Sequence, residues 1–180
     1  MVASRGMEKT YDVILVGGRP AGASLAARLA AAGLDVLVVE RDRFPSAPAV
    51  SAPFLLPHAM ALLDEIGADE AQYAEGTPRL PGLVLELADY FRVKISFSAE
   101  LTGRDYFYTI DRSRFDTALW RRLSTWPNVH ALEDTSVVEL LRDGDGRVSG
   151  VVLEDAAGAR REVRARAVVG ADGRFSLVAR

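Results

Sequence analysis

The sequence predicts an α/β fold, in which a parallel, Rossmann-like sheet is interrupted by an antiparallel β insertion. Three observations support this prediction. A strand, a glycine-rich turn, a small-residue helix and a second strand follow one another within residues 11–41. Three short strand-like runs then occupy residues 83–110, and a second set of strands extends from residue 129 to 169.

The first unit is built from the apolar strand Tyr11–Val16, a helix over Pro20–Ala32 and a second strand, Val36–Val39. Gly17 and Gly18 allow the tight turn out of the first strand, where a side chain would obstruct the chain or a ligand. The N–H groups at the start of the following helix have no intrahelical partners and favour an anion such as a pyrophosphate. This arrangement is typical of a dinucleotide-binding site.

Two further residues bear on this interpretation. Glu40 lies at the tip of the second strand, 18 residues beyond Gly22, close to the spacing expected for an acid that binds a ribose hydroxyl. Arg19 stands where the fingerprint expects glycine, so the backbone there must adopt conventional dihedral angles or approach the phosphate less closely. Its guanidinium could itself reach a phosphate. The alternative is a structural strand-to-helix turn that binds nothing.

Composition narrows the function classes. The 180 residues carry 49% hydrophobic and 26% charged residues, as in ordinary globular proteins, and form one large domain or one domain with a small lobe. The net charge of −3 does not indicate a nucleic-acid partner. The sequence has no cysteine, which excludes disulfides and thiolate metal sites. No run reaches transmembrane length, residues 1–9 form a loose lead-in, and we expect a cytoplasmic protein.

The middle of the chain alternates between loop, helix and strand. Four prolines between Arg41 and Pro57 predict a long, extended loop. Helical spacing follows over His58–Ile66, with a short second helix over Asp69–Ala74. The antiparallel insertion is expected to contain three strands: Leu83–Leu87, Phe91–Phe97 and Tyr106–Ile110.

The last third returns to helix and then to strands. A helix over Arg114–Thr125, capped by Asp111 or Ser113, precedes a short strand at Val129–Leu132. An Asp-Gly-Asp-Gly turn predicts a hairpin. The remaining expected elements are strands over residues 136–142, 147–154 and 162–169, and a helix that starts at Ser176.

Three motifs in order resemble the flavoprotein monooxygenase family of FAD-dependent aromatic hydroxylases, and particularly its geranylgeranyl-reductase-like branch. The first is the glycine turn, in which arginine at the second glycine position is a familiar variant of that branch. The second is the arginine-bearing helix start Ile110–Asp116. The third is Gly170-Ala171-Asp172-Gly173, which resembles the family's Asp-Gly motif.

The resemblance implies FAD as the cofactor and assigns its contacts. The residues implied to hold the pyrophosphate are Gly17, Gly18, Arg19, Pro20, Ala21 and Gly22. The other residues implied to contact the cofactor are Glu40 (ribose), Arg41 (adenosine), Arg112, Val137 (adenine, through its backbone), Asp172 and Gly173 (pyrophosphate–ribitol region). Each has a plainer alternative: Arg41 as a solvated surface charge, Arg112 paired with Asp116, and Asp172 as a turn residue.

The resemblance also implies a division of the chain and a reaction. The expected parts are a lead-in (1–9), an FAD-binding unit with its flavin-side loop (10–81), antiparallel strands of a partial substrate lobe (82–110), and a return to the FAD-binding domain (111–180). Family members continue beyond this point, so we expect a truncated, inactive chain that self-associates through its uncovered strands.

For the parent protein we expect NAD(P)H-dependent hydroxylation of a small organic substrate. The alternatives are double-bond reduction, halogenation, a non-catalytic nucleotide-binding remnant, or an NAD(P)-dependent dehydrogenase. No catalytic residue or metal ligand is assigned. The two histidines and both tryptophans, Trp120 and Trp126, are expected to have structural or surface roles.

Overall fold

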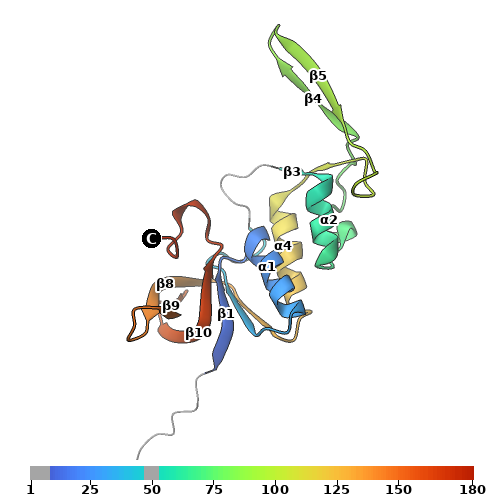
Figure 1. The fold of residues 1–180 in the computed structure, drawn as a ribbon. Helices are drawn as coiled ribbons and strands as arrows, with labels where there is room; N and C mark the ends of the chain where they lie inside the picture. Colours follow the sequence, from blue (N-terminus) through green and yellow to red (C-terminus); the bar gives the residue numbers. More distant parts are fainter. Residues whose placement is uncertain (1–8, 47–52) are drawn as a thin grey trace, which may run out of the picture. The chain divides into compact units, whose positions relative to one another are not determined.

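The computed structural model describes residues 9–46 and 53–180 (Figure 1). The chain divides into two compact units. The first unit comprises the chain up to Phe44 together with Leu119–Arg180, and the second unit comprises Pro45–Ala118. The boundaries expected from the sequence remain predictions, and each unit is described by itself below.

The first unit is organised around a six-stranded sheet with the order β7-β2-β1-β10-β9-β8. β1 pairs in parallel with β2 and β10, and β2 pairs in parallel with β7, whereas β9 is antiparallel to both β10 and β8. The strands are β1 (Thr10–Val16), β2 (Val36–Val39), β7 (Val129–Leu132), β8 (Thr135–Arg142), β9 (Val148–Asp155) and β10 (Arg160–Gly170). The predicted α/β class with a parallel, Rossmann-like sheet is therefore confirmed.

Helix α1 (Pro20–Ala31) connects β1 to β2, and its buried face consists only of small residues. These residues are Gly22, Ala23, Ala26, Ala27 and Ala30. Small side chains let a helix axis approach the sheet closely. Leu15 of β1 and Val36 of β2 share one face of the sheet and are fully buried. The side-chain amide of Asn128 fixes the end of the helix by donating to the carbonyl oxygens of Ala30 (3.0 Å) and Leu34 (2.7 Å).

The second unit contains short helices and antiparallel strands. Its elements are β3 (Phe54–Leu55), α2 (Pro57–Glu65), α3 (Glu70–Tyr73), β4 (Gly82–Leu87), β5 (Phe91–Ser96) and β6 (Tyr108–Thr109), followed by the start of α4 (Arg112–Leu123). β4 pairs with β5 and β3 with β6, both antiparallel, which confirms the predicted antiparallel insertion.

Two sequence-based expectations for elements are wrong. The strand expected over Tyr106–Ile110 shrinks to two residues, because its partner β3 is only two residues long. The helix expected from Ser176 is not formed up to Arg180. Instead, the 3₁₀ helix η1 (Gly173–Phe175) comes first, and the chain then turns. Part of the loop expected over 41–57 lies outside the described residues.

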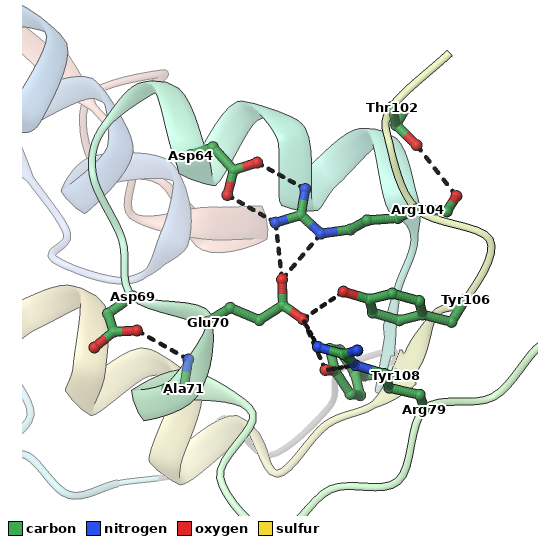
Figure 2. Close-up of polar contacts among 9 residues, drawn as sticks. All are labelled: Asp64, Asp69, Glu70, Ala71, Arg79, Thr102, Arg104, Tyr106 and Tyr108. Carbon is green, nitrogen blue, oxygen red and sulfur yellow. Dashed lines mark hydrogen bonds and ion pairs between the residues drawn. The ribbon is translucent and has the colours of Figure 1, made fainter. Parts of the chain in front are cut away.

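The second unit is tied together by the carboxylate of Glu70 on α3 (Figure 2). One carboxylate oxygen accepts from Arg104 Nε (2.9 Å) and Nη2 (2.8 Å), and the other from the hydroxyls of Tyr106 (2.7 Å) and Tyr108 (2.8 Å). Arg104 also forms a two-pronged ion pair with Asp64 of α2, at 2.7 and 2.9 Å. Burial alone would raise the pKa of Glu70, but hydrogen bonds from Tyr106, Arg104 and Tyr108 outweigh it and lower the pKa below 4.5.

Replacing Glu70 by glutamine should therefore destabilise the chain by about 1–3 kcal/mol at pH 7, because an amide cannot accept all of these hydrogen bonds. The folded pKa is depressed, so the stabilisation is fully present above pH 4.5 and is lost as the pH falls through the folded pKa. Urea unfolding at several pH values measures both effects. The control is Glu86→Gln, whose side chain is 58% exposed. A difference between wild type and Glu70→Gln that stays constant down to pH 3 would contradict this assignment.

Candidate functional site

The carboxyl ends of the parallel strands meet at one edge of the first unit's sheet. Gly17, directly after β1, donates its N–H to the last residue of β2 at 2.8 Å. Glu40, after β2, donates in the same way to the last residue of β7 (2.8 Å), and Ala171, after β10, to the last residue of β1 (2.7 Å). The turns after four strands are therefore held side by side, at the position where open α/β sheets bind ligands.

The glycine turn between β1 and α1 leaves no room for side chains. Gly17 has φ +103°, and a Cβ placed on it would lie 2.5 Å from the carbonyl oxygen of Ala171. A Cβ on Gly22 would lie only 1.8 Å from the carbonyl oxygen of Gly17. The first turn of α1 is thus packed directly on the turn that precedes it, which requires glycine at position 22. The positive φ and the contact with Ala171 require glycine at position 17.

The start of α1 presents backbone N–H groups to this edge. Arg19 is the N-cap residue in an extended conformation (φ −76°, ψ −173°), and its side chain makes no capping hydrogen bond to the helix. Pro20 occupies the first helical turn, and the N–H of Ala23 is bonded to the Arg19 carbonyl oxygen at 2.9 Å. The N–H groups of Ala21 and Gly22 precede that first intrahelical bond, so they can bind an anion here.

Glu40 is the acidic group of this edge, and only 4% of it is exposed. Its Oε2 accepts the N–H of Gly18 at 2.7 Å and its Oε1 accepts the N–H of Asp42 at 3.1 Å. A carboxylate offers about four acceptor positions, so these two bonds orient Glu40 and leave capacity for hydroxyl donors. The predicted ribose acid is therefore placed at the glycine turn, 22 residues from its Gly18 partner.

The arginines at this edge differ in their surroundings. The guanidinium of Arg19 forms an ion pair with Asp42 at 2.7 Å and lies 5.6 Å from the ring centroid of Phe44. Arg41 is 78% exposed and lies 3.9 Å from Asp42. A contact of either guanidinium with a phosphate or with adenosine stays a prediction.

Arg112 and Val137 have structural contacts of their own. Arg112 belongs to the second unit and forms an ion pair with the fully buried Asp116, one helical turn later, at 3.0 and 3.1 Å. Val137 pairs with Leu153 at a bulge in β8 and packs against the core of the first unit. Their assigned cofactor contacts remain predictions.

Asp172 and Gly173 follow β10, and a Cβ placed on Gly17 would lie 3.1 Å from the backbone nitrogen of Asp172. The Asp172 carboxylate accepts the N–H of Leu177 at 2.7 Å. Burial would raise the pKa of Asp172, but the Ser176 hydroxyl and backbone N–H groups of the same turn outweigh it and lower the pKa. Gly173 has φ +77° and no heavy atom within 4 Å of where a Cβ would stand. Asp172 thus makes the local turn contacts of the plainer alternative, and its role toward a cofactor remains a prediction.

Two residues that the sequence analysis did not assign to the site lie at the same edge. Trp120, near the end of α4, packs on Gly18, and Glu133, in the turn after β7, accepts the Trp120 indole N–H at 3.1 Å. Neither belongs to a local motif, because each is far along the chain from the glycine turn. Only the folded sheet reveals that they belong to this site.

The sequence matches a known family described as "FAD binding domain" over residues 10–180. The chain belongs to this FAD-binding domain family. It is 34% identical to the 6-methylpretetramide 4-monooxygenase of Streptomyces rimosus over 93% of the chain and 39% of the relative. It is 30% identical to the digeranylgeranylglycerophospholipid reductase of Methanosphaerula palustris over 97% of the chain and 41% of the relative.

A solved structure shows the same fold. The myxobacterial chondrochloren halogenase, described as an FAD-dependent halogenase, superimposes with a TM-score of 0.78 at 26% identity, over 92% of this chain and 38% of the halogenase. The chain therefore spans about two-fifths of the length of the curated relatives it matches. The relatives of this FAD-binding chain include monooxygenases, reductases and halogenases, which confirms the resemblance found in the sequence.

The residues at the sheet edge fit the ADP half of FAD. The uncapped start of α1 suits a diphosphate, and the buried acid Glu40 suits ribose hydroxyls. Within residues 9–46 and 53–180, no cluster of histidine, aspartate and glutamate side chains could hold a metal ion. No helix in the same described part is long and apolar enough to cross a membrane.

The ion pair between Arg19 and Asp42 generates a prediction. If the guanidinium stays on Asp42 when ADP binds, Arg19→Gln and Asp42→Asn should weaken ADP binding equally, and the double variant should be no weaker than either single one. Partly exposed ion pairs contribute about 0.5–1 kcal/mol to stability. The Asp42 N–H orients Glu40, so loss of the pair that anchors Asp42 should weaken ADP binding by about two- to fivefold. Titration calorimetry of the four proteins measures it. A loss confined to Arg19→Gln, with Asp42→Asn binding normally or more tightly, would instead show direct contact with the diphosphate.

Proposed function

We propose that this chain supplies the FAD-binding part of a flavin-dependent oxidoreductase that acts on a small organic molecule. The observation that carries the proposal is the buried Glu40 carboxylate, held 2.7 Å from the Gly18 N–H beside the uncapped start of α1. An acid for ribose hydroxyls and N–H groups for a diphosphate thereby lie together at the carboxyl edge of a parallel sheet.

The chain's own residues have distinct roles in this proposal. The N–H groups of Ala21 and Gly22 hold the diphosphate, and Glu40 accepts the adenosine ribose hydroxyls. The turn after β10, whose Ala171 and Asp172 lie against Gly17, is assigned to the pyrophosphate–ribityl side by family resemblance. Arg41, Arg112 and Val137 are assigned to the adenosine side and the remaining cofactor contacts by family resemblance. FAD, when bound, supplies the redox chemistry, and the protein supplies binding, orientation and electrostatics.

We further propose NAD(P)H as the electron donor and hydroxylation as the reaction of the whole protein. The similarity to a 4-monooxygenase supports hydroxylation. Reduction of a substrate double bond is the second candidate, and it is supported by 30% identity to a digeranylgeranylglycerophospholipid reductase over nearly the whole chain. Both reactions use the same ADP-binding edge, so the cofactor assignment does not depend on the choice between them.

The cofactor assignment is tested by identifying the nucleotide that the purified chain binds. We expect FAD to bind in preference to NAD, because the chain belongs to an FAD-binding family. An excess of ADP should compete with FAD, because ADP and FAD share the diphosphate and the ribose that Glu40 would hold. Titration calorimetry with FAD, ADP and NAD, together with the absorption spectrum of any nucleotide released on denaturation, decides the question. Stoichiometric NAD without flavin, or no binding of FAD or ADP, would refute the proposal.

Self-association through the β4–β5 hairpin is a separate proposal. The two strands pair only with each other among the described residues and carry exposed apolar side chains. These are Val84, Leu85, Leu87, Phe91, Val93 and Ile95. Leu85 and Val93 lie directly opposite each other.

We expect wild type to form dimers or larger species in light scattering, and Leu85→Glu with Val93→Lys to be monomeric. The double change keeps a complementary cross-strand pair while removing apolar surface. A wild-type chain that is a monodisperse monomer at the same concentration would contradict the proposal.

A further inference from the structure

We propose that Trp120 is a positioning residue of the ADP-binding edge, which acts through Gly18 to aim the Glu40 carboxylate at the ribose hydroxyls. This inference rests on the proposed FAD-binding function and adds a residue that lies outside the glycine turn. It follows from three contacts of one indole ring, with Gly18, Glu133 and Phe44.

The first contact is between the indole and the glycine turn. A Cβ placed on Gly18 would lie 2.2 Å from Cζ3 and 2.7 Å from Cε3 of Trp120, so the six-membered ring rests directly on the Gly18 backbone. The same Cβ would lie 3.1 Å from Cβ of Glu40. Gly18 is therefore enclosed between the indole and the base of the acid that its own N–H binds at 2.7 Å.

The second group of contacts fixes the indole. Its N–H donates to one carboxylate oxygen of Glu133 at 3.1 Å, and the other oxygen accepts the N–H of Phe44 at 2.6 Å. The Phe44 ring lies 5.1 Å from the indole ring at an interplanar angle of 31°. Glu133 thus joins the indole to the segment that follows Glu40, and only 7% of Trp120 is exposed.

These contacts fix the two backbone N–H groups that orient the Glu40 carboxylate. The Gly18 N–H donates to Oε2 of Glu40. The N–H of Asp42, in the segment anchored through Phe44, donates to Oε1. A hydrogen bond from a ribose hydroxyl to a carboxylate depends steeply on distance and angle. A shift of Gly18 into the space of a smaller side chain at position 120 would therefore turn Glu40 away from the ribose while leaving the diphosphate site at α1 in place.

The test compares ADP with 2′,3′-dideoxy-ADP, which has the diphosphate and the base but lacks both ribose hydroxyls. Selectivity is the ratio of the dideoxy-ADP dissociation constant to the ADP dissociation constant, measured by titration calorimetry on the 180-residue chain. We expect a wild-type selectivity of roughly ten- to a hundredfold, from charge-assisted hydrogen bonds to Glu40. Glu40→Ala should reduce the selectivity to about one.

Trp120→Leu should lower the selectivity by roughly tenfold while leaving dideoxy-ADP binding nearly unchanged. The matched control is Trp126→Leu. Trp126 follows the same helix, and its ring lies 5.7 Å from the Arg122 guanidinium. This control should keep wild-type selectivity, because Trp126 does not contact Gly18 among the described contacts. Equal weakening of both nucleotides in Trp120→Leu, or no change in either, would overturn the inference.

A second variant applies if Trp120→Leu does not fold. Glu133→Gln retains the indole, but its amide has one acceptor oxygen in place of the two that bind the indole N–H and the Phe44 N–H. It should lower the selectivity in the same direction by a smaller factor, and unchanged selectivity would count against the inference. If wild type binds neither ADP nor FAD, the proposed function itself fails. If wild type binds ADP and dideoxy-ADP equally, FAD binding stands, whereas the ribose role of Glu40 and the role of Trp120 are both refuted.

Discussion

The buried carboxylate of Glu40 is the constraint on which the candidate site depends. A polar group with 4% exposure is costly unless hydrogen bonds compensate for its lost hydration. Here the compensation comes from backbone N–H groups of two different turns, at Gly18 and at Asp42. The backbone of Glu40 also donates to β7 and accepts the N–H of Thr135 at the start of β8 (3.1 Å). One residue therefore joins the glycine turn, the sheet and the segment after β2.

This arrangement explains why the glycine turn and the acid occur together. The turn brings a backbone N–H to the place where the acid needs a donor, and the acid in turn holds the backbone in the conformation that exposes the start of α1. Loss of either partner leaves a buried polar group unpaired. The binding edge is therefore organised by the fold itself, and a ligand adds hydrogen bonds to groups that are already oriented.

The sequence predicted the β1-α1-β2 unit well because its determinants are local. Apolar runs, glycine positions and the spacing to Glu40 all lie within about thirty residues, so pattern and propensity are sufficient. Trp120 and Glu133 could not be predicted in the same way. They reach Gly18 and Phe44 only after β7 and α4 are in place, and nothing in their neighbouring sequence distinguishes an indole on a glycine from an indole in an ordinary core.

The error at Tyr106–Ile110 also arises because the structure depends on distant partners. Tyr106 and Tyr108 have the β-propensity of a strand, but only Tyr108 and Thr109 pair with β3, so the ladder is two residues long. A local pattern reports what a segment can form, whereas the partner decides how much of it forms.

Position 19, occupied by Arg19, distinguishes the glycines that the fold requires from the glycine that close approach of a phosphate would require. With φ −76° and ψ −173°, position 19 lies in a region open to every residue, so the fold does not need the glycine that the fingerprint expects. Gly17 and Gly22 are different, because a Cβ on Gly17 would overlap the carbonyl oxygen of Ala171, after β10, and a Cβ on Gly22 would overlap that of Gly17. Position 19 is therefore free to carry a side chain, and here the guanidinium extends to Asp42 and over Phe44, in the segment that Glu133 also anchors. The departure from the fingerprint thus falls at the one glycine position that the fold leaves unconstrained, and it adds a link to the segment that holds Glu40.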